Sequence, residues 1–175
     1  MNLLQRIKIK YDYYKIYNSF KKKGVILYKS VNLGGEPYLI SIGKNTLIAP
    51  KVTFINHDES KRVPQNRRNS DAYYNSYKTG MFGKIIIGEN CFIGYESIIL
   101  PNTTVGDNVV IGARSTVKGN IESGYVYAGA PAKKICSIEK YYEKIKENIV
   151  IIPDTVNKSD YFELKKYITD LMDKS

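Results

Sequence analysis

The sequence predicts a mainly β fold, a solenoid built from six-residue units, on three observations. An aliphatic residue recurs at every sixth position, at Ile87, Ile93, Ile99, Val105, Ile111 and Val117. Glycine directly follows four of these six residues. The same phase appears earlier, at Ile42, Ile48 and Phe54. Helices repeat near 3.6 residues and strands near 2, so a period of six indicates one short strand plus a corner, and three such units close one triangular coil.

The repeats should occupy a central domain, residues 25–135, with the aliphatic side chains inside the prism. Glycine at the corners should let the backbone turn. The spacing between the two runs of repeats is not a multiple of six. An insertion must therefore separate them, and we place it at about residues 55–83. This segment is polar and also carries Tyr73 and Tyr74. A long loop in a compact domain is usually functional, although a plain surface excursion remains the alternative.

Helices are expected on both sides of the repeats. Residues 1–24 should form a basic helix that ends near Gly24, with one apolar face made of Leu3, Leu4, Ile7, Tyr11, Tyr14 and Phe20. This helix should dock on the open end of the prism, and contact with an anionic membrane surface is the alternative. Residues 136–175 should form a helical extension that packs on the other end, and its second helix should begin at the N-cap Asp160.

Composition narrows the functional classes. The chain has 175 residues, a net charge of +10, 43% hydrophobic and 25% charged residues. It contains no run of 18 apolar residues and no apolar segment suited to secretion, so we expect a cytoplasmic protein. The basic excess invites a nucleic-acid partner, but no nucleic-acid-binding motif is present, and we expect none.

Taken together, the repeats and the segments Ile111–Val117 and Gly129–Lys133 resemble the hexapeptide-repeat acyltransferases. The resemblance covers roughly residues 33–135 and implies a left-handed parallel β-helix, a homotrimer and acetyl-CoA as the acyl donor. It also implies a sugar or cell-surface polysaccharide precursor as the acceptor of an O-acetyl group. The alternatives are N-acetylation of an amino sugar and a solenoid that only binds or scaffolds.

The chain contains one histidine, His57, at the root of the insertion. Transfer of an acetyl group to a hydroxyl needs a base, and histidine suits that role near neutral pH. The resemblance implies a catalytic histidine at this point. A partner should orient its ring, and Asp58, Glu59, Glu96 or a backbone carbonyl could do so. A metal site is not expected, because one histidine per chain cannot supply the three ligands of the metal-dependent relatives with this fold.

The resemblance also implies which residues contact the two substrates. The candidates for coenzyme A are residues of the late corners and of the Gly-Ala-Pro-Ala-Lys tail: Gly112, Ala113, Lys118, Gly119, Ala130, Lys133 and Lys134. Lys133 is the favoured phosphate partner. The candidates for the acceptor lie near His57, on the insertion or in the second coil: Asn56, Asp58, Glu96, Tyr73 and Tyr74.

Overall fold

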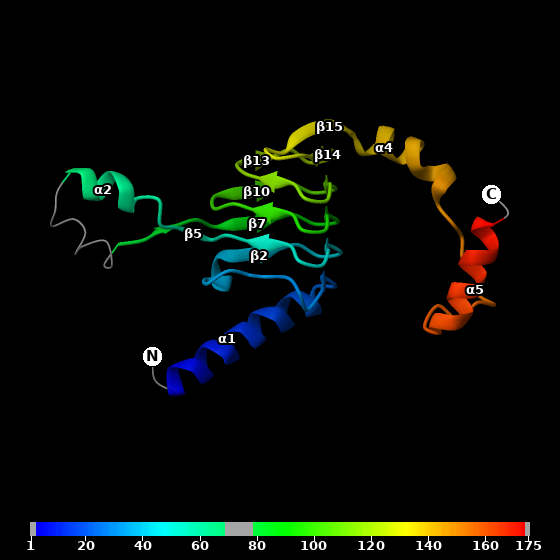
Figure 1. Ribbon diagram of the computed structural model, residues 1–175, viewed down its shortest axis with the longest axis horizontal. Coiled ribbons are helices and arrows are strands. Elements are labelled where there is room, and N and C mark those ends of the chain that lie inside the picture. The colour runs from blue at the N-terminus through cyan, green and yellow to red at the C-terminus, as the bar shows by residue number, and fades with distance from the viewer. Residues whose placement is uncertain (1–2, 69–78, 174–175) are drawn as a thin grey trace. The chain divides into compact units, whose positions relative to one another are not determined.

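The computed structural model describes residues 3–68 and 79–173. The chain divides into two compact units, Met1–Tyr141 and Tyr142–Ser175, and each is described by itself. In the first unit the strands stack in successive layers along one axis, beyond helix α1 (Leu3–Lys22) (Figure 1).

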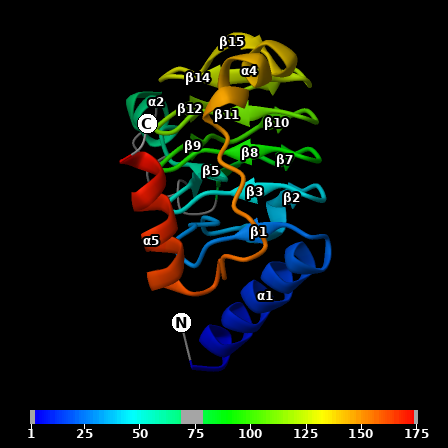
Figure 2. The same ribbon diagram turned by 90° about the vertical axis from the view of Figure 1, so that its right-hand side faces the viewer.

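Three sheets form the walls of the first unit. One contains β1 (Ile26–Leu27), β3 (Leu47–Ile48), β8 (Phe92–Ile93), β11 (Val110–Ile111), β14 (Tyr125–Ala128) and β15 (Lys133–Ser137). Another contains β2 (Ile40–Ile42), β7 (Ile85–Ile87), β10 (Thr103–Val105) and β13 (Asn120–Ile121). The third contains β4 (Thr53–Phe54), β9 (Ile98–Ile99) and β12 (Thr116–Val117). In Figure 2 the first sheet faces the viewer and the others recede on its two sides.

The register of these sheets confirms the predicted six-residue unit. Strands β7, β8 and β9 lie in three different sheets, and β10 returns to the sheet of β7 one coil later. All neighbours within the three walls pair in parallel except β14 and β15, and Ile87 pairs with Val105. The repeat residues are almost fully buried: Ile42, Ile48, Phe54, Ile87, Ile93, Ile99, Val105, Ile111 and Val117. Each coil therefore places its inward side chains on those of the coil before it.

The corners turn in a different way from the one predicted. The glycines after the repeat residues do not have positive φ; that role falls two positions later, for example on Asn90 (φ 52°) and Asn108 (φ 55°). Asparagine tolerates this left-handed conformation better than most residues. The glycines are needed for space, because a Cβ on Gly94 would lie 2.5 Å from the backbone nitrogen of Ala113 in the next coil. They allow the coils to stack closely.

Helix α1 docks at the N-terminal end of the coils, as predicted, but it contacts β1 and η1, which lead into the first coil, and it does so with a different face. It ends at Lys22, close to the predicted stop at Gly24, which has φ +74°. Phe20 is buried, and Tyr13 and Ile16 pack against the core. The Tyr17 hydroxyl donates a hydrogen bond to the carbonyl of Leu27 at 2.9 Å. Most of the predicted face is exposed instead, namely Leu4, Ile7, Tyr11 and Tyr14. Both sides of the helix are apolar, so periodicity alone could not select the packed one.

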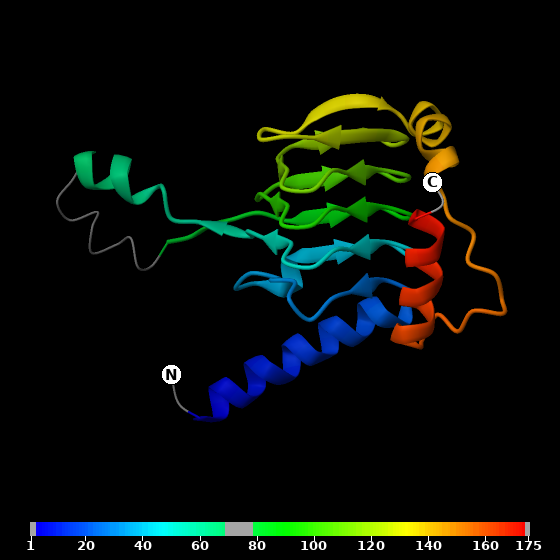
Figure 3. The same cartoon turned by 45° about the vertical axis from the view of Figure 1, so that its right-hand side comes forward.

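The insertion is more regular than the predicted loop. Strands β5 (His57–Asp58) and β6 (Met81–Phe82) pair antiparallel and form the base of a hairpin. Helix α2 (Arg62–Arg68) follows β5 in the segment that extends away from the coils (Figure 3). Tyr73 and Tyr74 lie outside the described residues.

The C-terminal end of the first sheet is completed by a strand. The predicted helices were expected to close this edge, but β15 pairs antiparallel with β14 and occupies it. Beyond it come α4 (Ile138–Ile145) and η3 (Lys146–Asn148). In the second unit, α5 (Tyr161–Met172) begins at the predicted N-cap, where the Asp160 carboxylate accepts from the backbone N–H groups of Phe162 and Glu163. The predicted domain limits at residues 24/25 and 135/136 stay predictions.

Candidate active site

His57 stands at the corner that follows β4, where the coil gives way to the hairpin. Its ring is held on one side by a residue that we did not predict: Nδ1 lies 2.7 Å from Oε2 of Glu36. Glu36 comes just before η1 (Pro37–Leu39), in the loop that leads into the first coil. The imidazole side chain is 43% exposed and the Glu36 side chain only 18%. With Nδ1 bonded to the carboxylate, the other ring nitrogen, Nε2, is left to meet a substrate.

Asn56 fixes the loop that presents Glu36. Its side chain is buried, and its Nδ2 donates to the carbonyls of Leu33 and Glu36, each at 2.9 Å. Its Oδ1 accepts from the backbone N–H of Glu36 at 3.3 Å. Gly34 has φ +72°, and a Cβ there would lie 2.6 Å from this Oδ1. Asn56 was predicted to contact the acceptor. Its buried amide instead forms hydrogen bonds with the loop that carries Glu36.

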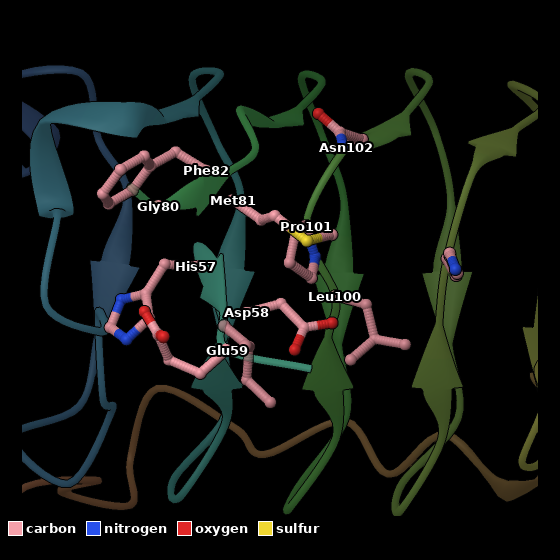
Figure 4. Close-up of a pocket in the computed structure, with 11 residues that line it drawn as sticks. His57, Asp58, Glu59, Gly80, Met81, Phe82, Leu100, Pro101 and Asn102 are labelled. Carbon is pink, nitrogen blue, oxygen red and sulfur yellow. The ribbon is translucent and has the colours of Figure 1, made fainter. Parts of the chain in front are cut away.

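An open pocket of about 720 Å³ lies beside His57. Figure 4 shows His57 on one side and Leu100 and Pro101, from the next coil, on the other. The hairpin supplies Phe82, whose ring packs edge-on against the imidazole with centroids 6.2 Å apart. Lys118, from the third coil, also lines the pocket. Three successive corners and the hairpin thus build one cavity around the histidine.

Two carboxylates at this pocket are kept ionised. Hydrogen bonds from Ser60 lower the pKa of Asp58, with smaller contributions from Lys118 and His57. A hydrogen bond from Lys61 lowers the pKa of Glu59, and that ion pair has a length of 2.8 Å. Neither group bonds the His57 ring, so Glu36 replaces both as its orienting partner. As carboxylates they can only accept hydrogen bonds, which suits them to donors such as sugar hydroxyls.

Glu96, the third predicted partner of His57, lies at another corner of the same chain. Its carboxylate is bonded to Lys51 Nζ at 3.3 Å and to Arg114 Nε at 3.2 Å. Lys51 also lies over the ring of Tyr95, with its Nζ 5.2 Å from the ring centroid. Within one chain, Glu96 therefore cannot orient the His57 ring.

The predicted coenzyme residues fall into two groups within one chain. Lys118 and Gly119 follow β12, at the corner of His57. Gly112 and Ala113 follow β11, at the corner of Glu96, and Ala130 follows β14 in the same sheet. One chain by itself does not bring both groups to one surface.

The two lysines of the tail differ in what they contact. Lys134 Nζ lies 2.5 Å from Glu122 Oε2 and 3.8 Å from the centroid of the Tyr125 ring. The bond to Glu122 raises the pKa of Lys134. Lys133 begins β15 and is exposed, and no ion pair joins it to another described residue. Of the two, Lys133 is therefore the one with a charge available to a ligand.

The fold and the histidine site together define a hexapeptide-type acyltransferase, and comparison with known proteins supports this class. The family model of the bacterial transferase hexapeptide (six repeats) matches residues 84–119. Protein CapG of Staphylococcus aureus is 41% identical over 140 residues, which are 77% of this chain and 72% of CapG. The chain belongs to the hexapeptide-repeat acyltransferase family, and the predicted enzyme class is confirmed.

Two further relatives come from Escherichia coli (strain K12). WbbJ, named for lipopolysaccharide biosynthesis O-acetyl transfer, is 34% identical over 61% of this chain and 53% of its own length. Galactoside O-acetyltransferase is 38% identical over 61% of this chain and 50% of its own length. The chain thus spans about half the length of these two proteins. A solved maltose O-acetyltransferase from Clostridium difficile 630 shares the fold, with 24% identity, a TM-score of 0.52, and coverage of 65% of this chain and 66% of that one.

Proposed function

We propose that this chain moves an acetyl group from acetyl-CoA to a hydroxyl of a sugar in a cell-surface polysaccharide precursor. The observation that carries this proposal is the pairing of His57 with Glu36 beside the open pocket. The similarity to WbbJ, named for lipopolysaccharide O-acetyl transfer, and to galactoside O-acetyltransferase supports both the O-acetyl transfer and the carbohydrate acceptor. We further propose that the coil is left-handed and that the protein works in the cytoplasm.

The geometry supports direct transfer with His57 as general base. Nε2 would take the proton of the acceptor hydroxyl while its oxygen attacks the thioester carbonyl. The tetrahedral intermediate then collapses, the C–S bond breaks, and the imidazolium returns the proton to the departing thiolate of coenzyme A. Glu36 holds the ring and stabilises its positive charge between these steps. Asp58 and Glu59 would accept hydrogen bonds from other hydroxyls of the acceptor.

An assay of thiol release from acetyl-CoA with a panel of sugars tests this function. We expect turnover with at least one hydroxyl-bearing sugar, and a product from which hydroxylamine removes the acetyl group, because esters react where amides resist. A hydroxylamine-resistant product formed only with amino sugars would establish N-acetylation instead. If no sugar stimulates thiol release and the His57→Ala protein behaves like the wild type, the chain is a binding or scaffolding solenoid.

The division of the coenzyme residues between two corners supports a homotrimer. A cleft that joins the His57 corner of one copy to the Gly112 corner of the next would contain all the candidates, and closed cyclic symmetry would give three equal clefts. We expect light scattering to report a trimer at every concentration that supports activity. An active monomer would contradict this assembly.

We predict that Lys133→Ala raises the KM for acetyl-CoA by about ten- to a hundredfold and changes kcat little. A charge-assisted contact to a phosphate is worth about 1.5–3 kcal/mol, and it would be equally strong in the ground state and the transition state. Steady-state kinetics with varied acetyl-CoA measure the effect. Lys134→Ala is the matched control and should change KM much less, because its charge is already paired with Glu122. Equal effects from both variants would remove the special role of Lys133.

A further inference from the structure

Helix α1 has an exposed apolar stripe opposite the face that packs on the coil. Its members are Leu4, Ile7, Tyr11 and Tyr14, which are between 55% and 76% exposed. Their spacing of three, four and three residues keeps them within an arc of about 80° on a helix of 3.6 residues per turn. Tyr13, Ile16 and Phe20 lie on the other side of the helix and pack on the core. The coil thus leaves a complete apolar stripe without a partner among the described residues.

Basic residues border this stripe on both sides. Lys8 and Lys15 lie along one border and Lys10 and Lys21 along the other, by the same helical geometry, and all four are exposed. Lys15 Nζ lies 4.7 Å from the centroid of the Tyr11 ring, so its stem runs along the stripe. The helix contains six basic residues and one acidic residue, Asp12. A surface that pairs with this face must therefore be apolar at its centre and negatively charged around it.

We propose that α1 docks this protein on an anionic membrane surface. A helix that lies in the interface buries its apolar stripe at the boundary of headgroups and acyl chains, while lysines at its edges reach the phosphates. Tyrosine suits this depth, because its ring is apolar and its hydroxyl stays at the headgroups. The described residues include no helix that is long and apolar enough to cross a membrane, so the contact is peripheral.

Charge favours a lipid surface over a second copy of the same helix. Two or three copies packed along the stripe would bring the bordering lysines of each close to those of the others, which is repulsive. A leaflet rich in anionic lipid attracts each of these lysines, by about 1 kcal/mol per residue near the surface. No residue of the stripe lines the pocket beside His57, so docking does not require that pocket to change.

Co-sedimentation of the full chain with vesicles tests the proposal. We expect binding to vesicles that contain phosphatidylglycerol, little binding to pure phosphatidylcholine, and weakening by added salt. The variant Leu4→Ser/Ile7→Ser should bind at least about tenfold more weakly, because it removes apolar area from the stripe. Lys8→Glu/Lys15→Glu should weaken binding by at least as much.

Matched changes on the second unit serve as controls. Phe162 (79% exposed) and Ile151 (83% exposed) present as much apolar surface as the stripe residues, so Phe162→Ser/Ile151→Ser should leave vesicle binding unchanged. Lys165→Glu/Lys166→Glu makes the same change in net charge as Lys8→Glu/Lys15→Glu, and it should weaken vesicle binding much less. Circular dichroism and activity on a water-soluble acceptor should be unaltered in all four variants.

Three outcomes would overturn the proposal. Wild-type binding that is equal for anionic and neutral vesicles would remove the role of charge. Equal losses of vesicle binding from the α1 variants and from the control variants on the second unit would show that the stripe is not the contact. If Leu4→Ser/Ile7→Ser leaves vesicle binding intact but changes the oligomeric state, the stripe is covered by another copy of this chain. None of these results depends on whether the enzyme O-acetylates a sugar.

Discussion

Replacing His57 with alanine is expected to lower kcat by about 10² to 10⁴, and acetyl-CoA binding should stay close to that of the wild type. In the proposed mechanism the imidazole acts on the proton of the acceptor, and no part of that role requires contact with the nucleotide of the coenzyme. The ring is 43% exposed, so its loss should also leave stability nearly unchanged. Stopped thiol-release assays give kcat, calorimetry gives the affinity for acetyl-CoA, and thermal unfolding checks the fold.

Two outcomes of the His57→Ala experiment would contradict the proposed role of the histidine. If activity survives within a few-fold, the base lies elsewhere, and the pocket offers the carboxylates of Asp58 and Glu59 and the amine of Lys118 in its place. If instead the affinity for acetyl-CoA falls in proportion to kcat, His57 supports coenzyme binding and the direct-attack mechanism must be redrawn. Tyr38→Ala changes a residue of η1 that is 71% exposed. It serves as a control for surface perturbation and should change neither kcat nor the affinity for acetyl-CoA.

Much of the fold could be predicted because each coil repeats the same packing problem. The inward residue of every unit contacts the equivalent residue one coil away, as Ile93 pairs with Ile111. The core residues therefore recur in the sequence at a fixed spacing. The glycine positions were read correctly, but for the wrong reason. The period shows where a small residue is needed, and only the structure shows that the next coil, at Ala113, occupies the space of the missing Cβ of Gly94.

The site was less predictable, because its key contact does not follow the period. His57 was recognisable as the one histidine at the end of a repeat run. Glu36 is 21 residues away from His57 and precedes the repeats. It reaches the ring because hydrogen bonds from Asn56 hold its loop against the end of β4. The signal that could have found it was the sequence Gly34-Gly35-Glu36-Pro37: a carboxylate after two glycines, which indicates a tight approach of backbone to another segment.

The same limit applies to helix α1. It carries apolar residues on two opposite faces, so the sequence alone does not show which of the two faces packs on the rest of the fold. Phe20 belonged to the predicted face and is buried, whereas Leu4 belonged to it and is exposed. The face that packs is the one that also forms hydrogen bonds. The Tyr17 hydroxyl donates to the carbonyl of Leu27, and the Tyr13 hydroxyl donates to the carbonyl of Gly34.

Glu36→Gln should lower kcat by about 10² to 10⁴, the upper figure being what the loss of an orienting carboxylate costs in a catalytic triad. The glutamine keeps the size of the side chain but cannot balance the charge of an imidazolium, and its amide can donate to Nδ1 and so favour the wrong tautomer. Glu59→Gln, at a carboxylate of the same pocket that does not bond the ring, is the matched control. It should affect the KM of the acceptor more than kcat.

Two measurements separate this positioning role from a merely structural one. Because the chain has one histidine, ¹⁵N NMR of labelled protein reports a single imidazole. Neutral His57 should carry its proton on Nδ1 in the wild type, and Glu36→Gln should shift part of the population to Nε2. In a double-mutant cycle, Glu36→Gln should cost almost nothing further once His57 is alanine, because a residue that acts through another has no effect without it. Additive losses, together with an unchanged tautomer, would show that Glu36 acts on the acceptor or on the fold and not through the histidine.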